Sequence, residues 1–442
     1  MKDEGSAEAG EPVGAGDKAM VPAAWPEFSI ARLPRIMFGG GTSGELGSVV
    51  REFGHKALLI VRGPSFTASP NWAGIRAALE SEGVEFALES VSGEPSPTIV
   101  DGIVARQRTR GSGSAPAPFD VVVGIGGGSV LDTAKAVAGL LITGHLVMDH
   151  LEGVGPELPY RGPSVPFIAV PTTAGTGSEA TKNAVVSVRG PGGFKKSFRD
   201  EMLVARVAIV DPDLLAACPP ELIAGNGMDT LTQLLESYVS TKANPFTDAL
   251  AMSGLAAVRD GLAVWFDEAS TPREAADPGN GAAGPVTAAA AARERMAYAA
   301  LCSGICLAQA GLGAVHGLAS PLGAQYPIPH GAACGATLVA ATRVNITALE
   351  SREPGNRALG RYAAVGRLFS GHAGADDREA CSDLVQAVEL LTASLGVPRL
   401  SSFGITGSSI PALVADSRGS SMKTNPIVLT DDEIGSILRV SL

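Results

Sequence analysis

The stretch Val121-Val122-Val123-Gly124-Ile125-Gly126-Gly127-Gly128-Ser129 decides the fold of this chain of 442 residues. It begins as a run of β-prone residues without polar alternation, which is expected of a strand covered on both faces. The run ends in glycines, and the segment 130–141 after it has the apolar spacing of a helix. Glycines let backbone N–H groups approach an anion, and the start of a helix directs positive charge at it. The stretch therefore predicts a buried strand that leads into a phosphate-binding turn, with a plain glycine-rich turn as the alternative.

Other apolar runs indicate further strands of the same sheet, at 57–61, 167–170 and 208–210. Amphipathic stretches such as 72–82 separate them, and this alternation is typical of an α/β domain with a mostly parallel sheet. Beyond residue 212 the β-branched runs nearly vanish and long Ala/Leu-rich periodic segments replace them. We therefore predict an α/β domain over 28–212 and an all-α domain over 213–442. A ligand is expected in the cleft between them, near the carboxyl ends of the strands.

Three segments have a composition that cannot bury enough apolar surface to offset the cost of ordering. The first is a predicted disordered tail over residues 1–27, rich in Ala, Gly, Glu and Pro. The others are Gly/Pro/Ala-rich insertions at 111–118 and at about 271–291. None of the three is given a function.

The net charge of −11 and the pI near 5.1 argue against a nucleic-acid or anionic-membrane surface, because such surfaces need a clustered positive field. The five cysteines form no CxxC pair, so neither a disulfide framework nor a zinc knuckle is indicated. No apolar run approaches the length of a membrane span, and the N-terminus lacks a signal-peptide pattern. We expect a cytoplasmic protein with small, soluble partners.

A second loop strengthens the case for a nucleotide. The predicted strand 167–170 leads into Pro171-Thr172-Thr173-Ala174-Gly175-Thr176-Gly177, where hydroxyl groups and glycines lie within a few residues. Such groups can donate hydrogen bonds to phosphate or ribose oxygens. Two loops of this kind at the ends of two strands of one sheet are much more specific than either loop alone.

A metal site is indicated in the helical part. Asp229 and Gln233 lie four residues apart, so on a helix both side chains project from one face. His316 and His330 could add two imidazole nitrogens, and a carboxylate with imidazoles suits Fe(II) or Zn(II). Gln233 is the anomaly, because a neutral amide oxygen is a poorer ligand than imidazole. Either histidine taken alone would more often be a structural residue.

Five motifs together resemble the iron-containing, or group III, alcohol dehydrogenases. They are GGGSVLDTAKA (126–136), PTTAGTGSEAT (171–181), VDPDL (210–214), GMDTLTQ (227–233) and GLGAVHGLASPLGAQYPIPHG (311–331). The resemblance covers almost everything from about residue 28 onward, apart from the insertions. It implies a Rossmann-like dinucleotide-binding domain, a helical metal domain of the dehydroquinate synthase-like kind, and a homodimer.

The resemblance also assigns roles to residues of the metal site. In the family, the ligands are an Asp, a His four residues later and two further His, and they map onto Asp229, Gln233, His316 and His330. Gln233 therefore stands where a histidine is expected. Ser320 stands where many relatives carry a histidine thought to assist proton transfer. We take all five as candidate catalytic residues of a subfamily with altered chemistry.

The cofactor is expected to be NADP(H) rather than NAD(H). Many NAD-using relatives have an Asp after the first strand, and this chain has Gly63 there, so no carboxylate repels a 2′-phosphate that Arg62 and Ser65 could bind. The alternative is that both cofactors are accepted. For Lys135, three residues after Asp132, an ordinary ion pair on the helix surface is the alternative to a cofactor role. The full set of expected cofactor-binding residues is Gly63, Ser65, Ser96, Gly126, Gly127, Gly128, Ser129, Asp132, Thr172, Thr173, Thr176, Lys195 and Leu222.

The resemblance predicts an NAD(P)-dependent alcohol dehydrogenase or aldehyde reductase. A hydride would pass directly between nicotinamide and a small alcohol or aldehyde while a divalent metal, Fe(II) or Zn(II), polarises the substrate oxygen. Two alternatives stay open. One is a metal-independent reductase similar to the maleylacetate reductases of this superfamily, and the other is an NADPH-binding relative without turnover.

Overall fold

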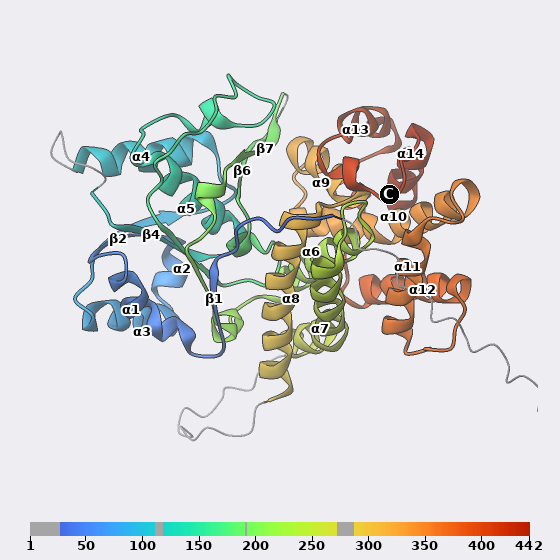
Figure 1. Ribbon diagram of the computed structural model, residues 1–442, viewed down its shortest axis with the longest axis horizontal. Helices are drawn as coiled ribbons and strands as arrows, with labels where there is room; N and C mark the ends of the chain where they lie inside the picture. The colour runs from blue at the N-terminus through green and yellow to red at the C-terminus, as the bar shows by residue number, and fades with distance from the viewer. Residues whose placement is uncertain (1–26, 111–117, 191, 272–286) are drawn as a thin grey trace, which may run out of the picture.

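The computed structural model describes residues 27–110, 118–190, 192–271 and 287–442. The predicted tail, apart from residue 27, lies outside these ranges, and so do residues 111–117 and 272–286 of the two predicted insertions. The sheet and the helices that pack on it form one side of the described molecule, and an assembly of helices forms the other side (Figure 1).

A parallel six-stranded sheet forms the centre of the first part, in the order β1-β8-β5-β4-β2-β3. Val123 of β4 lies in register with Leu59 of β2 on one side and Ile168 of β5 on the other. The four strands predicted from apolar runs are the inner strands β2, β4, β5 and β8, so the predicted parallel sheet is confirmed. The strands are β1 (Arg35–Phe38), β2 (Lys56–Arg62), β3 (Glu85–Val91), β4 (Val121–Gly126), β5 (Phe167–Pro171) and β8 (Val207–Val210).

Helices cover both faces of the sheet, which explains why the inner strands lack polar alternation. In β2, Leu58 and Ile60 pack into the hydrophobic cluster that contains α4 and α5, whereas Leu59 and Val61 pack into the cluster that contains α1 and α3. Successive side chains of a strand point to opposite faces, so the buried residues 57–61 of this strand each meet an apolar layer, whereas the two ends of the strand are exposed. The helices are α1 (Leu46–Arg51), α2 (Gly63–Thr67), α3 (Pro70–Ser81), α4 (Pro97–Arg110) and α5 (Gly128–Leu140).

Four strands were not predicted. The edge strands β1 and β3 are partly exposed, and Glu85 and Glu89 interrupt the apolar pattern of β3. The other two form an antiparallel hairpin outside the main sheet, β6 (Asn183–Val188) and β7 (Phe194–Arg199). Strands with one solvated side or edge carry polar residues, so a search for continuous apolar runs does not find them.

All elements described after Val210 are helical, as predicted. Helices α6, α7 and α8 stand beside the sheet domain, and α10 to α14 form the far side of the molecule (Figure 1). The helices are α6 (Pro220–Val239), α7 (Pro245–Ser270), α8 (Ala288–Ala310), α9 (Ala314–Gln325), α10 (His330–Arg352), α11 (Arg357–Ser370), α12 (Asp377–Ser394), α13 (Ile410–Asp416) and α14 (Asp431–Ser441).

Helix α8 begins earlier than the sequence suggested. Residues 288–291 were expected to belong to the insertion, but they form the first turn of α8, and the Thr287 hydroxyl caps it by accepting a bond from Ala290 N. The cause is the run of alanines, because alanine has the highest helix propensity of all residues. By composition, these alanines were counted with the glycines and prolines before them as part of the insertion.

Among the described residues, α7 and α10 are long and apolar enough to cross a membrane by length and composition, and so is the bent pair of α8 and α9 if it counts as one span. This corrects the expectation that no stretch of the chain approaches a membrane span. The sequence reading looked for uninterrupted apolar runs, whereas these helices reach the required mean hydropathy with small and polar residues interspersed. In α10, 67% of the apolar window is buried inside the protein, against 39% in α7. Much of the apolar surface of α10 therefore packs on the neighbouring helices.

The sheet and the helices share one hydrophobic cluster. It runs from the α1 and α3 face of the sheet into α6, α7 and α8. The loop after β5 meets α8 backbone to backbone, because a Cβ on Gly304 would lie 2.1 Å from the carbonyl oxygen of Gly177. The boundary between residues 212 and 213 stays a prediction, although the strands do end at Val210.

Candidate active site

A cavity of about 1420 Å³ lies where the carboxyl ends of β4 and β5 face α6, α9 and α10. It exceeds the usual ligand pocket of about 300–1,000 Å³, as a site for a dinucleotide plus a substrate would. This is the position at which α/β sheets bind ligands. The predicted site residues that line it are Gly127, Gly128, Ser129, Asp132, Thr173, Thr176, Lys195, Leu222, Asp229, Gln233, His316, Ser320 and His330.

The glycine turn meets the second loop closely. Gly127 precedes the first turn of α5, and no side chain caps that turn. A Cβ on Gly128 would lie 2.6 Å from Thr176 Oγ1, and one on Gly127 would lie 3.0 Å from Thr173 Oγ1. Because the first N–H groups of a helix lack partners within the helix, this turn offers donors to an anion.

Buried polar groups tie the two loops together. Ser178 Oγ donates to Asp132 Oδ1 at 2.5 Å, and the backbone N–H of Val185 donates to Asp132 Oδ2 at 3.1 Å. Lys135 Nζ lies 3.6 Å from Asp132 Oδ1 and donates to the carbonyl oxygens of Ser178 and Asn183 at 2.8 and 2.7 Å. Lys135 is fully buried, so the alternative of an ion pair on the helix surface is wrong: the pair with Asp132 lies inside the fold.

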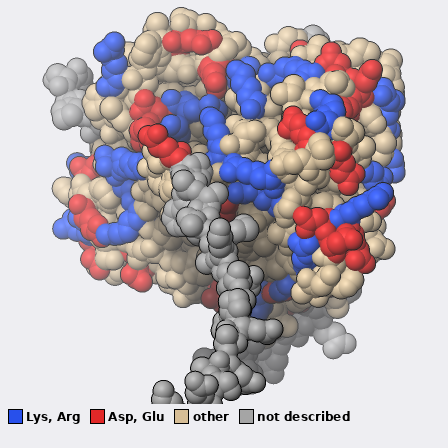
Figure 2. All heavy atoms as spheres, turned by 45° about the vertical axis from the view of Figure 1, so that its right-hand side comes forward, with Lys and Arg blue, Asp and Glu red and all other residues tan. Residues whose placement is uncertain are grey.

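Basic side chains line part of the cavity, although the chain is acidic overall. Lys195, Lys196 and Arg199 come from β7, and Arg62 is the last residue of β2. Lys and Arg side chains also gather near the middle of the face drawn in Figure 2, among scattered Asp and Glu. Positive charge along a cleft favours an anionic ligand such as a nucleotide.

Four predicted cofactor residues do not line the cavity. Ser96 Oγ accepts a bond from Ile99 N at the start of α4, which is a capping role. Gly63 begins α2 with a φ of 34°, a conformation that favours glycine. Gly126 is the last residue of β4, and its carbonyl oxygen accepts a backbone hydrogen bond from Thr172, the first residue after β5. The side chain of Ser65 lies outside the part of the chain that the structure describes.

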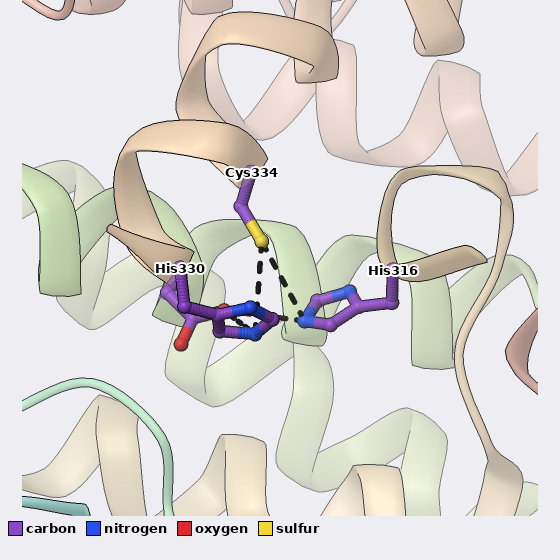
Figure 3. Close-up of side chains that lie close together, drawn as sticks. His316, His330 and Cys334 are labelled. Carbon is purple, nitrogen blue, oxygen red and sulfur yellow. Dashed lines mark hydrogen bonds and ion pairs between the residues drawn. The ribbon is translucent and has the colours of Figure 1, made fainter. Parts of the chain in front are cut away.

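Four side chains from three helices lie close together at the helical side of the cavity. His316 comes from α9, and His330 and Cys334 come from α10 (Figure 3). The fourth residue, Asp229, comes from α6. Asp229 Oδ1 lies 3.2 Å from His316 Nε2 and 3.8 Å from His330 Nε2. Cys334 Sγ lies 3.8 Å from His316 Nε2 and 3.9 Å from His330 Nε2. The four ligand atoms all lie within 4.8 Å of one another, so they can surround one ion.

The backbone explains why these helices meet. Helices α8 and α9 are bent by 101° at their junction, and His316 lies in the first turn of α9. His330 begins α10, and a Cβ on the next residue, Gly331, would lie 2.2 Å from the carbonyl oxygen of Gly225 in α6. This close approach of α10 to α6 requires glycine and places His330 near Asp229.

Glu236 supports the cluster from behind, and sequence reasoning missed it. His316 Nδ1 and Glu236 Oε2 lie 2.7 Å apart, and the backbone N–H of Val315 donates to Glu236 Oε1 at 2.7 Å. A carboxylate in this position orients the imidazole and directs Nε2 at an ion. The signal was present, because Glu236 lies seven residues after Asp229 and so shares its helix face.

Comparisons with known proteins identify the family from both halves of the chain. The sequence model of the family described as "Iron-containing alcohol dehydrogenase" matches residues 34–212, and that described as "Fe-containing alcohol dehydrogenase family, C-terminal" matches residues 281–442. Alcohol dehydrogenase 4 of Schizosaccharomyces pombe is 31% identical over 413 residues, which cover 92% of this chain and 87% of that protein. The chain belongs to the iron-containing alcohol dehydrogenase family.

Solved structures agree with this membership. The crystal structure of a 1,3-propanediol oxidoreductase matches with a TM-score of 0.79 and 27% identity, covering 94% of this chain and 100% of that one. Sulfoacetaldehyde reductase from Bifidobacterium kashiwanohense, solved in complex with NAD+, matches with a TM-score of 0.75 and 27% identity, covering 94% and 99%. This member of the family is thus an NAD(P)-dependent oxidoreductase that acts on alcohols, and it has the fold of its family.

The two unusual residues of this alcohol dehydrogenase both line the cavity. Gln233 is buried, and its Oε1 accepts a hydrogen bond of 2.7 Å from Ser303 Oγ. Ser320 Oγ donates to the carbonyl oxygen of Lys195 at 3.4 Å. Gln233 as a ligand and Ser320 in proton transfer stay predictions.

Electrostatics within the cluster set its charges before any ion enters. Burial disfavours the charged form of the His316 imidazole. Its partners Cys334, Asp229 and Glu236 outweigh burial and raise the pKa of this ring well above its usual value. Burial lowers the pKa of His330 to about 4 and raises that of Cys334 to about 12. Burial would raise the pKa of Asp229, but the two imidazoles hold it at about 2.

A first prediction for this alcohol dehydrogenase concerns Glu179, which follows the second loop. Burial raises its pKa from 4.5 to about 7. Between these two pKa values the folded protein holds a proton on Glu179 that the unfolded chain has lost. The free energy of unfolding of the parent protein therefore falls as pH rises through this range. In Glu179→Gln the free energy of unfolding, relative to the parent protein, should rise by up to about 3 kcal/mol between pH 4.5 and 8.

Denaturant unfolding at several pH values measures this difference. Glu294→Gln, on an exposed part of α8, is the matched control and should show no such trend. A parallel pH dependence for Glu179→Gln and the parent protein would contradict the prediction.

Proposed function

We propose that this protein is an alcohol dehydrogenase or aldehyde reductase that uses NADP(H) and a divalent metal, Fe(II) or Zn(II). A hydride would pass directly between the nicotinamide and the carbinol or carbonyl carbon of a small substrate. The observation that carries the proposal is that one cavity contains both the glycine turn at the start of α5 and the cluster Asp229, His316 and His330. The glycine turn can bind the phosphates of a nucleotide, and the cluster can hold an ion that polarises a substrate oxygen.

The residues present fit a divalent ion. A carboxylate and two imidazoles form a common ligand set for Zn(II) and Fe(II), and Glu236 holds His316 so that Nε2 faces the other donors. A bound ion would act as a Lewis acid that polarises the substrate oxygen and lowers the pKa of an alcohol.

The chain's own residues would bind and orient the reactants. The uncapped first turn of α5 would donate to the pyrophosphate, and the Thr173 and Thr176 hydroxyls would add bonds from the facing loop. Holding nicotinamide and substrate in one cavity supplies the proximity that hydride transfer needs. The Ser320 hydroxyl lies in the same cavity and would carry the proton in place of the histidine of many relatives.

NADP(H) is favoured because Arg62 lines the cavity and is exposed, and no carboxylate stands at Gly63. Removing a charge-assisted hydrogen bond costs about a factor of ten in affinity. Arg62→Ala should therefore weaken NADPH binding roughly tenfold and leave NADH binding unchanged. Fluorescence titration with both nucleotides measures this.

Arg76→Ala is the control for this substitution, because Arg76 lies on α3, pairs with Glu80 and is exposed away from the cavity. Equal losses for NADPH and NADH, or no loss for either, would refute the assignment of Arg62 to a 2′-phosphate.

Metal analysis of the purified protein, paired with activity before and after chelation, tests the proposal. We expect about one Fe or Zn ion per chain, turnover of a short-chain aldehyde panel with NADPH, loss of turnover on chelation and recovery on adding the ion back. Full activity in metal-free protein would reject the metal.

A metal-independent reductase is the second candidate, and one observation favours it. Gln233 replaces a histidine, and Ser303 already occupies its Oε1. In that case His330, which lines the cavity and whose Nδ1 has no hydrogen-bond partner among the described residues, would hydrogen-bond the carbonyl directly. The chelation experiment separates the two candidates. The homodimer and the cytoplasmic location stay predictions.

A further inference from the structure

Cys334 is a buried side chain that the proposed reaction has not used. It lies four residues after His330 on α10, so the two side chains project from the same helix face. Its sulfur lies within 4 Å of both imidazole Nε2 atoms, those of His316 and His330. Figure 3 shows the sulfur directed at the two rings. A cysteine that only filled space in the core would not need to meet three other donor atoms.

The distances are close to those of a tetrahedral site. With bond lengths of about 2.0 Å to nitrogen or oxygen and 2.3 Å to sulfur, neighbouring ligand atoms are roughly 3.3 Å apart, or roughly 3.6 Å where one is sulfur. The Asp229 oxygen lies 3.2 and 3.8 Å from the two Nε2 atoms. The sulfur lies 3.8 and 3.9 Å from them. The other two pairs of ligand atoms lie within 4.8 Å of each other, so shifts of up to about 1 Å would close the set around an ion.

Gln233 is the weaker donor for the fourth position. Its Oε1 already accepts a 2.7 Å bond from Ser303, and a neutral amide is a poorer ligand for Zn(II) than a thiolate. We propose that Cys334 replaces the missing histidine as the fourth protein ligand, together with Asp229, His316 and His330. This inference rests on the metal in the proposed function and specifies its site.

The thiolate changes what the site selects. Two anionic ligands, from Asp229 and Cys334, neutralise a divalent ion, whereas one carboxylate with neutral donors leaves a net positive charge. A softer donor also favours Zn(II) or Co(II) over Mn(II) or Mg(II). The protein should therefore prefer zinc to the harder divalent ions. The substrate oxygen would have to enter as a fifth ligand and would be polarised less strongly than at a site of one carboxylate and three imidazoles.

Cobalt(II) tests this without relying on turnover. Metal-free protein is titrated with Co(II), and thiolate ligation is read from the sulfur-to-cobalt charge-transfer absorption in the near ultraviolet. We expect this band in the parent protein and in Gln233→Ala. Cys334→Ser should lack the band and bind Co(II) at least about 100-fold more weakly. Cys306→Ser is the matched control, since Cys306 is equally buried but lies on α8 near Thr247 O, and it should behave like the parent protein.

The outcomes separate this inference from the proposed function. Stoichiometric cobalt binding without the band, or loss of cobalt from Gln233→Ala but not from Cys334→Ser, would overturn the role of Cys334 alone. Failure of the parent protein to bind Co(II) or Zn(II) while it still reduces an aldehyde would overturn the metal as well. The spectrum of the parent protein decides between these results even if Cys334→Ser fails to fold.

Discussion

Turnover is expected to fall at least about 1,000-fold in Asp229→Ala and in His316→Ala, with nucleotide affinity almost unchanged. Asp229 lies between both imidazoles, and His316 connects that carboxylate to Glu236. Either substitution removes a donor from a buried set and leaves the other groups without their partners. The expected loss corresponds to the several kcal/mol that polarising an oxygen by a metal supplies.

Steady-state kinetics with an aldehyde substrate, beside NADPH titration by fluorescence, measures the two effects separately. Nucleotide dissociation constants should stay within about twofold, because the cluster and the phosphate loops are separate sites. Glu294→Gln, on an exposed face of α8, is a control that should keep full turnover. Near-normal turnover in both Asp229→Ala and His316→Ala would reject the cluster as the catalytic centre.

The inner part of the fold could be predicted because burial on both faces imposes a simple pattern. The strands β2, β4, β5 and β8 are continuous apolar runs in the sequence, and three consecutive glycines indicate the turn at the end of β4. Edge strands such as β3 have no such pattern, because part of each strand faces solvent and carries polar residues there. The apolar pattern therefore predicts a strand that is covered on both faces, and it does not predict a strand that is exposed at the edge of the sheet.

The site was predicted incompletely for a different reason. Asp229 and Gln233 were found by asking which residues share a helix face, and the same question applied to His330 would have found Cys334. Applied seven residues beyond Asp229, it would have found Glu236. Ser303, which binds Gln233, carries no such signal, because only the packing of α8 on α6 brings it there. Contacts within one helix are readable from spacing, but contacts between helices require the fold.

Nucleotide binding should be lost in Gly128→Val, with dissociation constants for NADPH raised by about 100-fold or more. The reason is the space between the two loops. A Cβ on Gly128 would lie 2.6 Å from Thr176 Oγ1 and 2.8 Å from Thr176 Cγ2, so Thr176 must move away or the first turn of α5 must shift. Either change separates donors that have to reach the same pyrophosphate, and the branched side chain would occupy part of the anion's place.

Gly74→Val is the matched control, because Gly74 lies on the exposed side of α3 and nothing lies within 4 Å of a Cβ there. It carries the same cost of a β-branched residue in a helix but leaves the cavity intact. Thermal unfolding of both variants shows whether Gly128→Val still folds, and metal content shows whether the cluster survives. We expect a folded Gly128→Val protein that retains its metal and no longer binds NADPH. Unchanged NADPH affinity would mean that the pyrophosphate lies elsewhere in the cavity, and the β4 to α5 turn would then be a structural feature only.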